Sequence, residues 1–449
     1  MQRETLGSRL GFILLSAGCA IGIGNVWKFP YMVGQYGGAA FVLVYLFFLI
    51  VLGVPVMTME FAVGRASRKS IMSSHRELEK PGSKWHLHGY MALIGNVMLM
   101  MFYTTVAGWM LQYFVDMAIG KFAGLDATGV KTAYGSMLAE PGTMMIYMAI
   151  VVIMGFAACS LGVQKGVERI SKVMMLALLA IMIVLAVNSI FLEGGAEGLK
   201  FYLLPDFGKM QETGVINVIV GAMSQAFFTL SLGIGSMAIF GSYIGKERTL
   251  MGEAVNVAIL DTFVAITSGL IIFPACFAYG VQPDSGPDLI FITLPNIFNN
   301  LPMGRLWGSL FFVFMSFAAL TTVLAVFENI LSCTMELFGW NRKKACLIDG
   351  IAMFILSVPC LLGFNILKGI SIFGKDIMGA EDFLVSNIIL PVGALLYVLF
   401  CVTRYGWGWD NFVKEANEGK GLKVAKWLRP YCTIILPVVI LVLFIMGLI

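Results

Sequence analysis

Long, uninterrupted apolar stretches constrain this chain more than any other feature of its sequence. A helix that crosses ~30 Å of hydrocarbon needs about 20 apolar residues, because each residue adds ~1.5 Å along the helix axis. We therefore predict an all-α polytopic membrane protein with about eleven transmembrane helices in a single domain, residues 1–449. The predicted spans are residues 9–36, 39–64, 89–120, 143–162, 166–192, 214–244, 250–280, 304–338, 345–364, 379–403 and 428–448.

The composition excludes the main soluble alternatives. The chain is 59% hydrophobic and only 12% charged, whereas an ordinary soluble protein is about 25% charged. A cytosolic enzyme, a nucleic-acid-binding protein and a disordered chain all need more charge than this. The apolar stretches contain no nucleophile–base pair and no metal cluster, so we also expect no enzymatic activity.

The cysteines and histidines indicate neither a disulfide framework nor a metal site. His86 and His88 lie in a basic polar segment without a cysteine or carboxylate cluster, which favours a solvated loop over metal binding. The cysteines lie within apolar runs or near their ends, which predicts buried free thiols. They are Cys19, Cys159, Cys276, Cys333, Cys346, Cys360, Cys401 and Cys432.

The distribution of Lys and Arg predicts the orientation of the chain. With a cytoplasmic N-terminus, 22 of the 30 Lys and Arg residues fall on the cytoplasmic side, in agreement with the positive-inside rule. An odd number of spans then places the C-terminus on the extracellular side. The expected location is the plasma (cell inner) membrane. Residues 404–427 mix charged and aromatic side chains, which predicts a short cytoplasmic helix with aromatic membrane anchors. The alternative is a plain connecting loop. The proline-containing residues 281–303 predict an ordered extracellular loop.

Two predicted spans contain glycine-rich interruptions. Both carry Gly-Ile-Gly, at residues 22–24 and 233–235. Glycine lowers the cost of leaving helical geometry, although membrane helices also use glycine for close packing. Unwound backbone inside a membrane is tolerated only beside a cavity, and breaks in corresponding halves indicate a transporter built from an inverted repeat. The two repeats are predicted at residues 9–192 and 214–403, with 428–448 as an eleventh helix.

The residues around these breaks resemble the neurotransmitter:sodium symporter family. The resemblance covers residues 8–400, and its most specific motifs are Gly22-Ile23-Gly24-Asn25-Val26-Trp27-Lys28-Phe29-Pro30, Gly37-Gly38-Ala39-Ala40-Phe41, Gly53-Val54-Pro55 with Glu60 and Gly64-Arg65, and Phe227-Phe228-Thr229-Leu230-Ser231-Leu232-Gly233. It implies the LeuT fold, a 5+5 inverted repeat with helices 1 and 6 unwound at mid-membrane. The number of spans and the short outer loops are similar to bacterial members.

The resemblance implies two coupling sodium ions. Sodium is a hard cation that prefers carbonyl, hydroxyl and carboxylate oxygens. The first ion site would use Ala20, Asn25, Thr229 and Asp261, completed by the substrate carboxylate. The second would use the carbonyls of Gly18, Ile21 and Ala318 with the hydroxyls of Thr321 and Thr322.

Asp261 bears on chloride dependence. A carboxylate within an apolar span is costly and is a functional candidate by default. Chloride-dependent members bind chloride near the residues that match Tyr45, Gln225 and Thr229, and their chloride-site serine is matched here by Ala265. We expect Asp261 to supply the fixed negative charge, so that no chloride is required.

The expected substrate is a hydrophobic L-amino acid such as Trp, Phe, Tyr, Leu, Ile or Val. Amine-carrying members have an aspartate where this chain has Gly22, so the substrate should bring its own carboxylate, held by Tyr103. An apolar pocket offers no partner for a charged side chain. The resemblance assigns to the substrate site Ala20, Gly22, Ile23, Gly24, Leu99, Tyr103, Phe228, Thr229, Ser231, Gly233, Ile234, Ala318, Thr322 and Val326.

Gates are implied on both sides of this site. Lys28 and Asp382 match the outer ion pair, and the inner gate would consist of Arg3 and Glu336 with Tyr243 and Ser242 in support. The proline that kinks the fifth helix in close relatives is replaced by Leu176, which keeps that helix intact. A channel and an amino-acid sensor remain alternatives that only flux measurements separate. The expected partners are the amino acid, sodium and the lipid bilayer, with no nucleic acid and no obligate protein partner.

Overall fold

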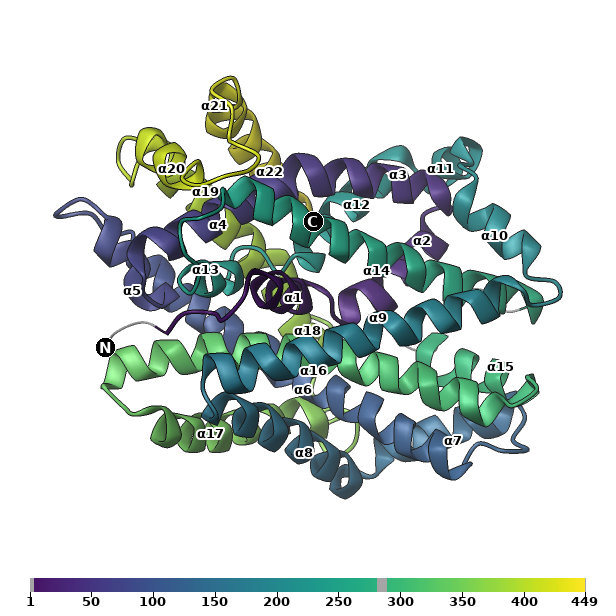
Figure 1. Ribbon diagram of the computed structural model, residues 1–449. Helices are drawn as coiled ribbons and strands as arrows, with labels where there is room; N and C mark the ends of the chain where they lie inside the picture. The colour runs from purple at the N-terminus through teal and green to yellow at the C-terminus, as the bar shows by residue number, and fades with distance from the viewer. Residues whose placement is uncertain (1–3, 281–288, 449) are drawn as a thin grey trace.

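The computed structural model describes residues 4–280 and 289–448, and its regular secondary structure within these ranges is helical. Long helices lie side by side along one direction, with the N-terminus, α5 and α20 toward one end of the bundle and α7, α10 and α15 toward the other (Figure 1). Nine helical stretches among the described residues are long and apolar enough to cross a membrane. They are α3–η2–α4 (Ala39–Ser67), α6 (Leu87–Ile119), α8 (Pro141–Ser160), η3–α9 (Val163–Ile190), α14 (Leu250–Ala278), α16 (Gly304–Phe338), α17 (Arg342–Leu362), α18–η5–α19 (Ile377–Val402) and α21–η6–α22 (Leu428–Met446).

Two further predicted spans are broken, as the glycine pairs indicated. In the first, α1 (Arg9–Ala20) is bent by 55° relative to the stretch formed by η1 (Gly24–Lys28) and α2 (Phe29–Gln35). In the second, α12 (Val215–Thr229) and α13 (Ser236–Gly241) are separated by six non-helical residues, 230–235. Gly233 and Gly235 have φ of +101° and +72°, a region that glycine enters without steric cost.

Shorter helices connect the spans or cover their ends. They are α5 (Ile71–Leu78), α7 (Ala127–Ala139), α10 (Ala196–Leu203), α11 (Phe207–Thr213), α15 (Leu294–Asn300) and α20 (Trp409–Ala416). Residues 281–288 of the predicted extracellular loop lie outside the described residues. Its continuation, η4 (Leu289–Thr293) and α15, is largely buried.

Helix α20 forms where a short interfacial helix was predicted, but its aromatic residues are not lipid anchors. Trp409 and Phe412 are buried, and the helix packs on α4 (Val54–Ser67). An ion pair of 2.6 Å between Arg65 Nε and Glu415 Oε1 fixes this contact. The apolar face of α20 was therefore assigned to the wrong environment, because a protein surface and a lipid surface select the same amphipathic pattern.

The core forms where α6 and α16 pack along each other, beside α1, α9 (Arg169–Ile190) and α8. All eight cysteines are buried free thiols, as predicted. The solvated-loop prediction is wrong for His88, which is buried in the first turn of α6, whereas His86 is partly exposed and contacts Glu79. Leu176 lies within the uninterrupted helix α9.

Candidate functional site

The two helix breaks meet at a small cavity in the middle of the bundle. The breaks and the helix ends beside them contribute backbone and the side chains of Phe228, Ser231 and Ile234. Helices α6 and α16 contribute Leu99, Tyr103 and Thr322. The cavity measures about 20 Å³. It is lined by nine residues of the predicted substrate site together with Cys19 and Leu390: Ala20, Gly22, Gly24, Leu99, Tyr103, Phe228, Ser231, Ile234 and Thr322. Gly22 leaves no room for a side chain, because a Cβ there would lie 2.6 Å from Thr322 Oγ1 and against the Tyr103 hydroxyl.

The other five predicted substrate residues lie around this cavity without lining it. Ile23 faces a neighbouring cavity and donates its N–H to the Tyr103 hydroxyl at 3.1 Å. Val326 and Ala318 are buried in α16. Thr229 and Gly233 make buried contacts described below.

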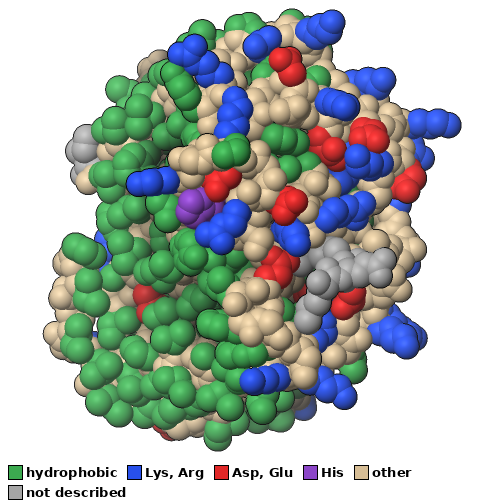
Figure 2. All heavy atoms as spheres, turned by 90° about the vertical axis from the view of Figure 1, so that its left-hand side faces the viewer, with side chains coloured by type: hydrophobic (Ala, Val, Ile, Leu, Met, Phe, Trp, Pro, Cys, Tyr) green, Lys and Arg blue, Asp and Glu red, His purple; other side chains and the backbone are tan. Residues whose placement is uncertain are grey.

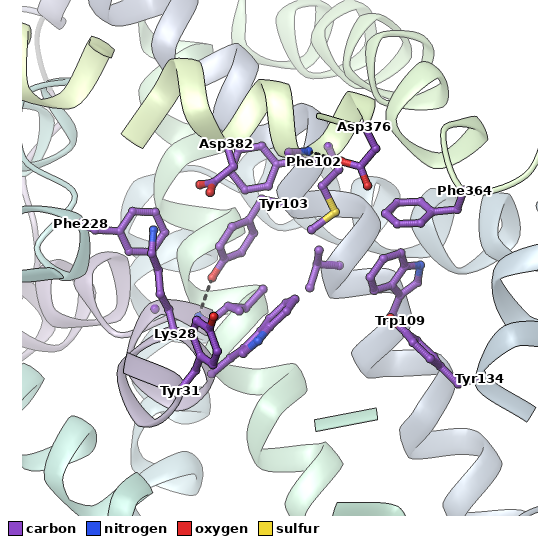
Figure 3. A pocket seen from close by; sticks show the side chains of 16 residues that line it. Lys28, Tyr31, Phe102, Tyr103, Trp109, Tyr134, Phe228, Phe364, Asp376 and Asp382 are labelled. Carbon is purple, nitrogen blue, oxygen red and sulfur yellow. Dashed lines mark hydrogen bonds between the residues drawn. The ribbon is translucent and has the colours of Figure 1, made fainter. Parts of the chain in front are cut away.

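A second cavity of about 360 Å³ adjoins the first. Gly24, Tyr103 and Phe228 line both cavities, so the Tyr103 and Phe228 side chains form the partition between them. Figure 3 shows the aromatic side chains of Tyr31, Phe102, Trp109 and Phe364 around the larger cavity, with Lys28, Asp376 and Asp382 at its edges. An aromatic wall with a few charged groups suits an apolar molecule that carries ionic groups.

The predicted ion pair between Lys28 and Asp382 is not formed in this conformation. The Lys28 ammonium lies 3.8 Å from the centroid of the Phe228 ring, a cation–π contact. The Asp382 carboxylate accepts a hydrogen bond of 2.7 Å from the Ser386 hydroxyl. The two side chains face the same cavity (Figure 3), so the sequence placed them on one site but did not determine their partners.

Asp261 gathers the polar groups of the first predicted ion site. Its carboxylate accepts from Asn25 Nδ2 at 2.8 Å and from Thr229 Oγ1 at 3.2 Å. The Tyr45 hydroxyl donates to its other oxygen at 3.3 Å. The side chains of Asn25, Tyr45, Thr229 and Asp261 are all buried. A buried carboxylate surrounded only by neutral polar groups is suited to a cation.

Gln225 and Ala265 lie near this cluster. Gln225 donates from Nε2 to the Gly24 carbonyl at 3.0 Å, and its side-chain oxygen is buried without a hydrogen-bond partner among the described residues. Ala265, also buried, follows Asp261 by one helical turn on α14. It provides no hydroxyl that could bind an anion.

The second predicted ion site is assembled around two threonines of α16. Thr322 Oγ1 lies 3.2 Å, 3.3 Å and 3.4 Å from the carbonyl oxygens of Gly18, Ile21 and Ala318. Thr321 Oγ1 is 3.0 Å from the Ala318 carbonyl. Three carbonyls and two hydroxyls therefore converge where the end of α1 crosses α16, a donor set of hard oxygens that fits sodium.

Glu60 was not predicted as a site residue, yet it fixes the second helix break. This carboxyl group of α4 accepts from the backbone nitrogen of Gly233 at 2.5 Å and from that of Met237, at the start of α13, at 3.3 Å. On the other side of the break, His88 Nε2 lies 3.2 Å from the Gly233 carbonyl oxygen. An acidic residue within an apolar span was the signal that could have identified Glu60.

A polar network closes the bundle at the end that carries the N-terminus. Glu328 accepts from Tyr243 at 2.8 Å and pairs with Arg342 at 2.7 Å. Arg342 also pairs with Glu4 at 3.3 Å, an arrangement that the sequence did not indicate. The predicted gate residue Glu336 accepts from the backbone and hydroxyl of Ser70.

The structure describes only one of the two remaining members of the predicted inner gate, Arg3 and Ser242. Arg3 lies outside the described residues. Ser242 is buried, and its carbonyl oxygen accepts a hydrogen bond of 3.2 Å from Arg68. Its hydroxyl donates to the Ile239 carbonyl one turn earlier.

Comparisons with known proteins agree along the whole chain. A model of the sodium:neurotransmitter symporter family matches residues 3–123 and 127–449. An uncharacterized sodium-dependent transporter of Bacillus subtilis is 36% identical over 397 residues, covering 88% of this chain and 86% of that protein. The sodium-dependent serotonin transporter of Drosophila melanogaster is 26% identical over 495 residues, covering 99% of this chain and 76% of that protein.

A solved structure is similar over the same extent. The crystal structure of MhsT in complex with L-phenylalanine superimposes with a TM-score of 0.89 at 36% sequence identity, covering 99% of this chain and 100% of that one. The similarity therefore extends over the parts of this chain that form both broken helices.

Proposed function

Because the chain belongs to the sodium:neurotransmitter symporter family, we propose that it is a sodium-coupled symporter that imports hydrophobic L-amino acids by alternating access. The observation that carries this proposal is the central cavity between two helix breaks, with two clusters of hard oxygens close to it. Broken helices present backbone groups to a substrate and to sodium at the same time. Binding of each would then depend on the other.

The substrate class follows from the lining of the cavity. No acidic side chain lines it among the described residues, and Gly22 has no space for one. The substrate must therefore contribute the carboxylate, which Tyr103 and the first sodium would hold. Leu99, Phe228 and Ile234 would enclose an apolar side chain of the Trp, Phe, Tyr, Leu, Ile or Val type. The co-crystallisation of MhsT with L-phenylalanine supports this class.

Two sodium ions are proposed, with the oxygen sets around Asp261 and Thr322 as their sites. The Asp261 carboxylate would balance one sodium charge without a bound anion, so transport would not require chloride. Tyr103 and Phe228 form the partition over the substrate and would have to move apart for its entry. The larger aromatic cavity would be the outer vestibule, and the network of Glu328 and Arg342 the closed inner side. This assignment corresponds to a cytoplasmic N-terminus in the plasma membrane.

Uptake into proteoliposomes tests the proposal directly. With an inward sodium gradient, labelled tryptophan and leucine should accumulate above their outside concentration, and potassium in place of sodium should abolish this. Chloride replacement by gluconate should leave uptake unchanged. Sodium-dependent binding without uptake would instead indicate a sensor, and downhill flux that cannot concentrate the substrate would indicate a channel.

Thr322→Val should weaken sodium activation of transport. Valine keeps the shape of threonine but removes the side-chain oxygen that contacts all three carbonyls of the second cluster. Loss of one buried oxygen ligand weakens the binding free energy of sodium by about 1.5–3 kcal/mol. The sodium concentration for half-maximal uptake should therefore rise roughly 10–100-fold. Thr322→Ser, which retains the hydroxyl, is the matched control and should stay within about threefold. Equal sodium dependence of all three proteins would refute this ion site.

A further inference from the structure

A further large cavity opens at the surface of the bundle, away from the residues that line the substrate cavity. It is a lateral groove of about 790 Å³ between the α3–η2–α4 span, α14 and the segment that leads into α22. Its walls are almost entirely apolar, and the side chains at its mouth are exposed, with Trp427 74% and Ile259 60% accessible. The lining residues are Leu46, Leu49, Ile50, Val51, Val54, Pro55, Met251, Val255, Ala258, Ile259, Thr262, Leu422, Trp427, Leu428 and Tyr431.

Hydrogen bonds hold the segment that borders the groove at two places. At its edge, the Tyr431 hydroxyl donates a hydrogen bond of 2.7 Å to the Val51 carbonyl, which ties the start of the last span to η2 (Leu49–Gly53). At the other edge, the backbone of Lys420 bonds to Glu247 and Thr249 just before α14, at 2.9 Å and 3.3 Å. The segment 420–431 is therefore tied to the start of α14 at one end and to η2 at the other.

The length of the groove matches one acyl chain. Its lining follows α14 from Met251 to Thr262, which is about 16 Å at ~1.5 Å per residue. One leaflet contributes about half of the ~30 Å hydrocarbon core, or ~15 Å. A polar or charged ligand would leave its polar groups without partners against such walls.

Unpaired positive charge borders the groove at one end. Lys420, Lys423, Lys426 and Arg429 are exposed and alternate with lining residues, and none forms an ion pair within residues 4–280 and 289–448. Two acidic residues just before this segment pair with other cations, since Glu415 pairs with Arg65 and Glu418 pairs with Lys246. Figure 2 shows Lys and Arg side chains gathered on this end of the bundle, beside a broad hydrophobic surface.

We propose that this groove binds an anionic phospholipid, with one acyl chain along α14 and the phosphate held by Lys423, Lys426 and Arg429. Clustered cations beside a membrane helix attract anionic headgroups, while an apolar groove of one-leaflet depth takes the chain. The exposed indole of Trp427 would then lie between the acyl chain and the headgroup, where tryptophan is enriched at membrane interfaces. The site is separate from the substrate cavity, because no residue lines both.

Quenching of Trp427 fluorescence by brominated lipid tests the proposal. The protein is reconstituted in phosphatidylcholine vesicles that contain 10 mol% of a lipid brominated on its acyl chains, either phosphatidylglycerol or phosphatidylcholine. The Trp427 signal is the difference between the parent protein and Trp427→Phe. Brominated phosphatidylglycerol should quench this signal about threefold more effectively than brominated phosphatidylcholine at low salt.

Two variants separate a lipid site from general attraction to the membrane surface. The first is the triple variant Lys423→Gln/Lys426→Gln/Arg429→Gln, in which the two brominated lipids should quench about equally. Its control is Lys343→Gln/Lys344→Gln, which removes exposed cations elsewhere and should keep the preference for phosphatidylglycerol. Ala258→Phe fills the groove and should reduce quenching by both brominated lipids. A preference that persists in the triple variant, or quenching that is unchanged in Ala258→Phe, would overturn the proposal. Retained sodium-driven uptake in each variant shows that the protein is folded.

Discussion

Asp261→Asn is expected to reduce sodium-driven uptake about 100-fold in chloride-free buffer. The substitution removes the negative charge around which Asn25, Thr229 and Tyr45 are arranged. Loss of a charge partner for a buried cation costs about 3 kcal/mol, which corresponds to roughly two orders of magnitude in affinity. The loss should appear as weaker sodium activation, measured as initial uptake over a series of sodium concentrations.

Chloride should partly replace the missing carboxylate. In the double variant Asp261→Asn/Ala265→Ser, a hydroxyl is added one helical turn away from residue 261. We expect uptake by this variant to be about tenfold faster with chloride than without it. The parent protein should be indifferent to chloride. Asp349→Asn is the control for removal of a buried carboxylate elsewhere, because Asp349 contacts Thr334 in a different part of the bundle. Parent uptake that collapses in gluconate would refute the role assigned to Asp261.

Glu60→Ala is expected to abolish transport and to lower the thermal stability of the protein. Glu60 is the acceptor for two backbone N–H groups at the second helix break, on Gly233 and Met237. Without it, these donors remain buried and unsatisfied, at a cost of about 1–3 kcal/mol each. The unwound segment that lines the substrate cavity would then lose its position, and uptake should fall at least about 100-fold.

Glu60→Gln separates the hydrogen-bonding role from a charge role. Glutamine keeps one acceptor oxygen at nearly the same volume, so we expect uptake to fall only about tenfold. Thr58→Val is the control on the same helix, because Thr58 donates only to the Val54 carbonyl one turn earlier; it should remain within about twofold. Thermal unfolding in detergent and initial uptake rates provide the two readouts. Unchanged uptake by Glu60→Ala would show that the break is held by other contacts.

The class of the fold could be predicted from local sequence features. Apolar length identified each membrane span, and the paired Gly-Ile-Gly segments identified the two broken helices, which the structure places at Ala20–Gly24 and Thr229–Ser236. These features are local because hydrocarbon provides no hydrogen bonds, so each span must satisfy its own backbone. The family resemblance was confirmed over residues 3–123 and 127–449, and it identified most residues of the central cavity.

The partners of polar side chains could not be predicted in the same way. Lys28 contacts the Phe228 ring instead of Asp382, and both arrangements are compatible with the same sequence. Glu60 and His88 hold opposite sides of Gly233 across sequence separations of 173 and 145 residues. Such contacts depend on how helices dock against one another.

The sequence by itself therefore determined that this chain is a helical membrane transporter and where its helices break. It also supplied the oxygen-bearing residues that we propose as sodium ligands. Only the tertiary structure decided which of those residues meet, that α20 covers α4 rather than lipid, and that a groove bordered by lysines opens beside α14. The physical reason is the range of the interactions. Helix formation and breakage in a membrane are set within one span, whereas ion pairs, cavities and grooves arise from side chains that distant spans bring together.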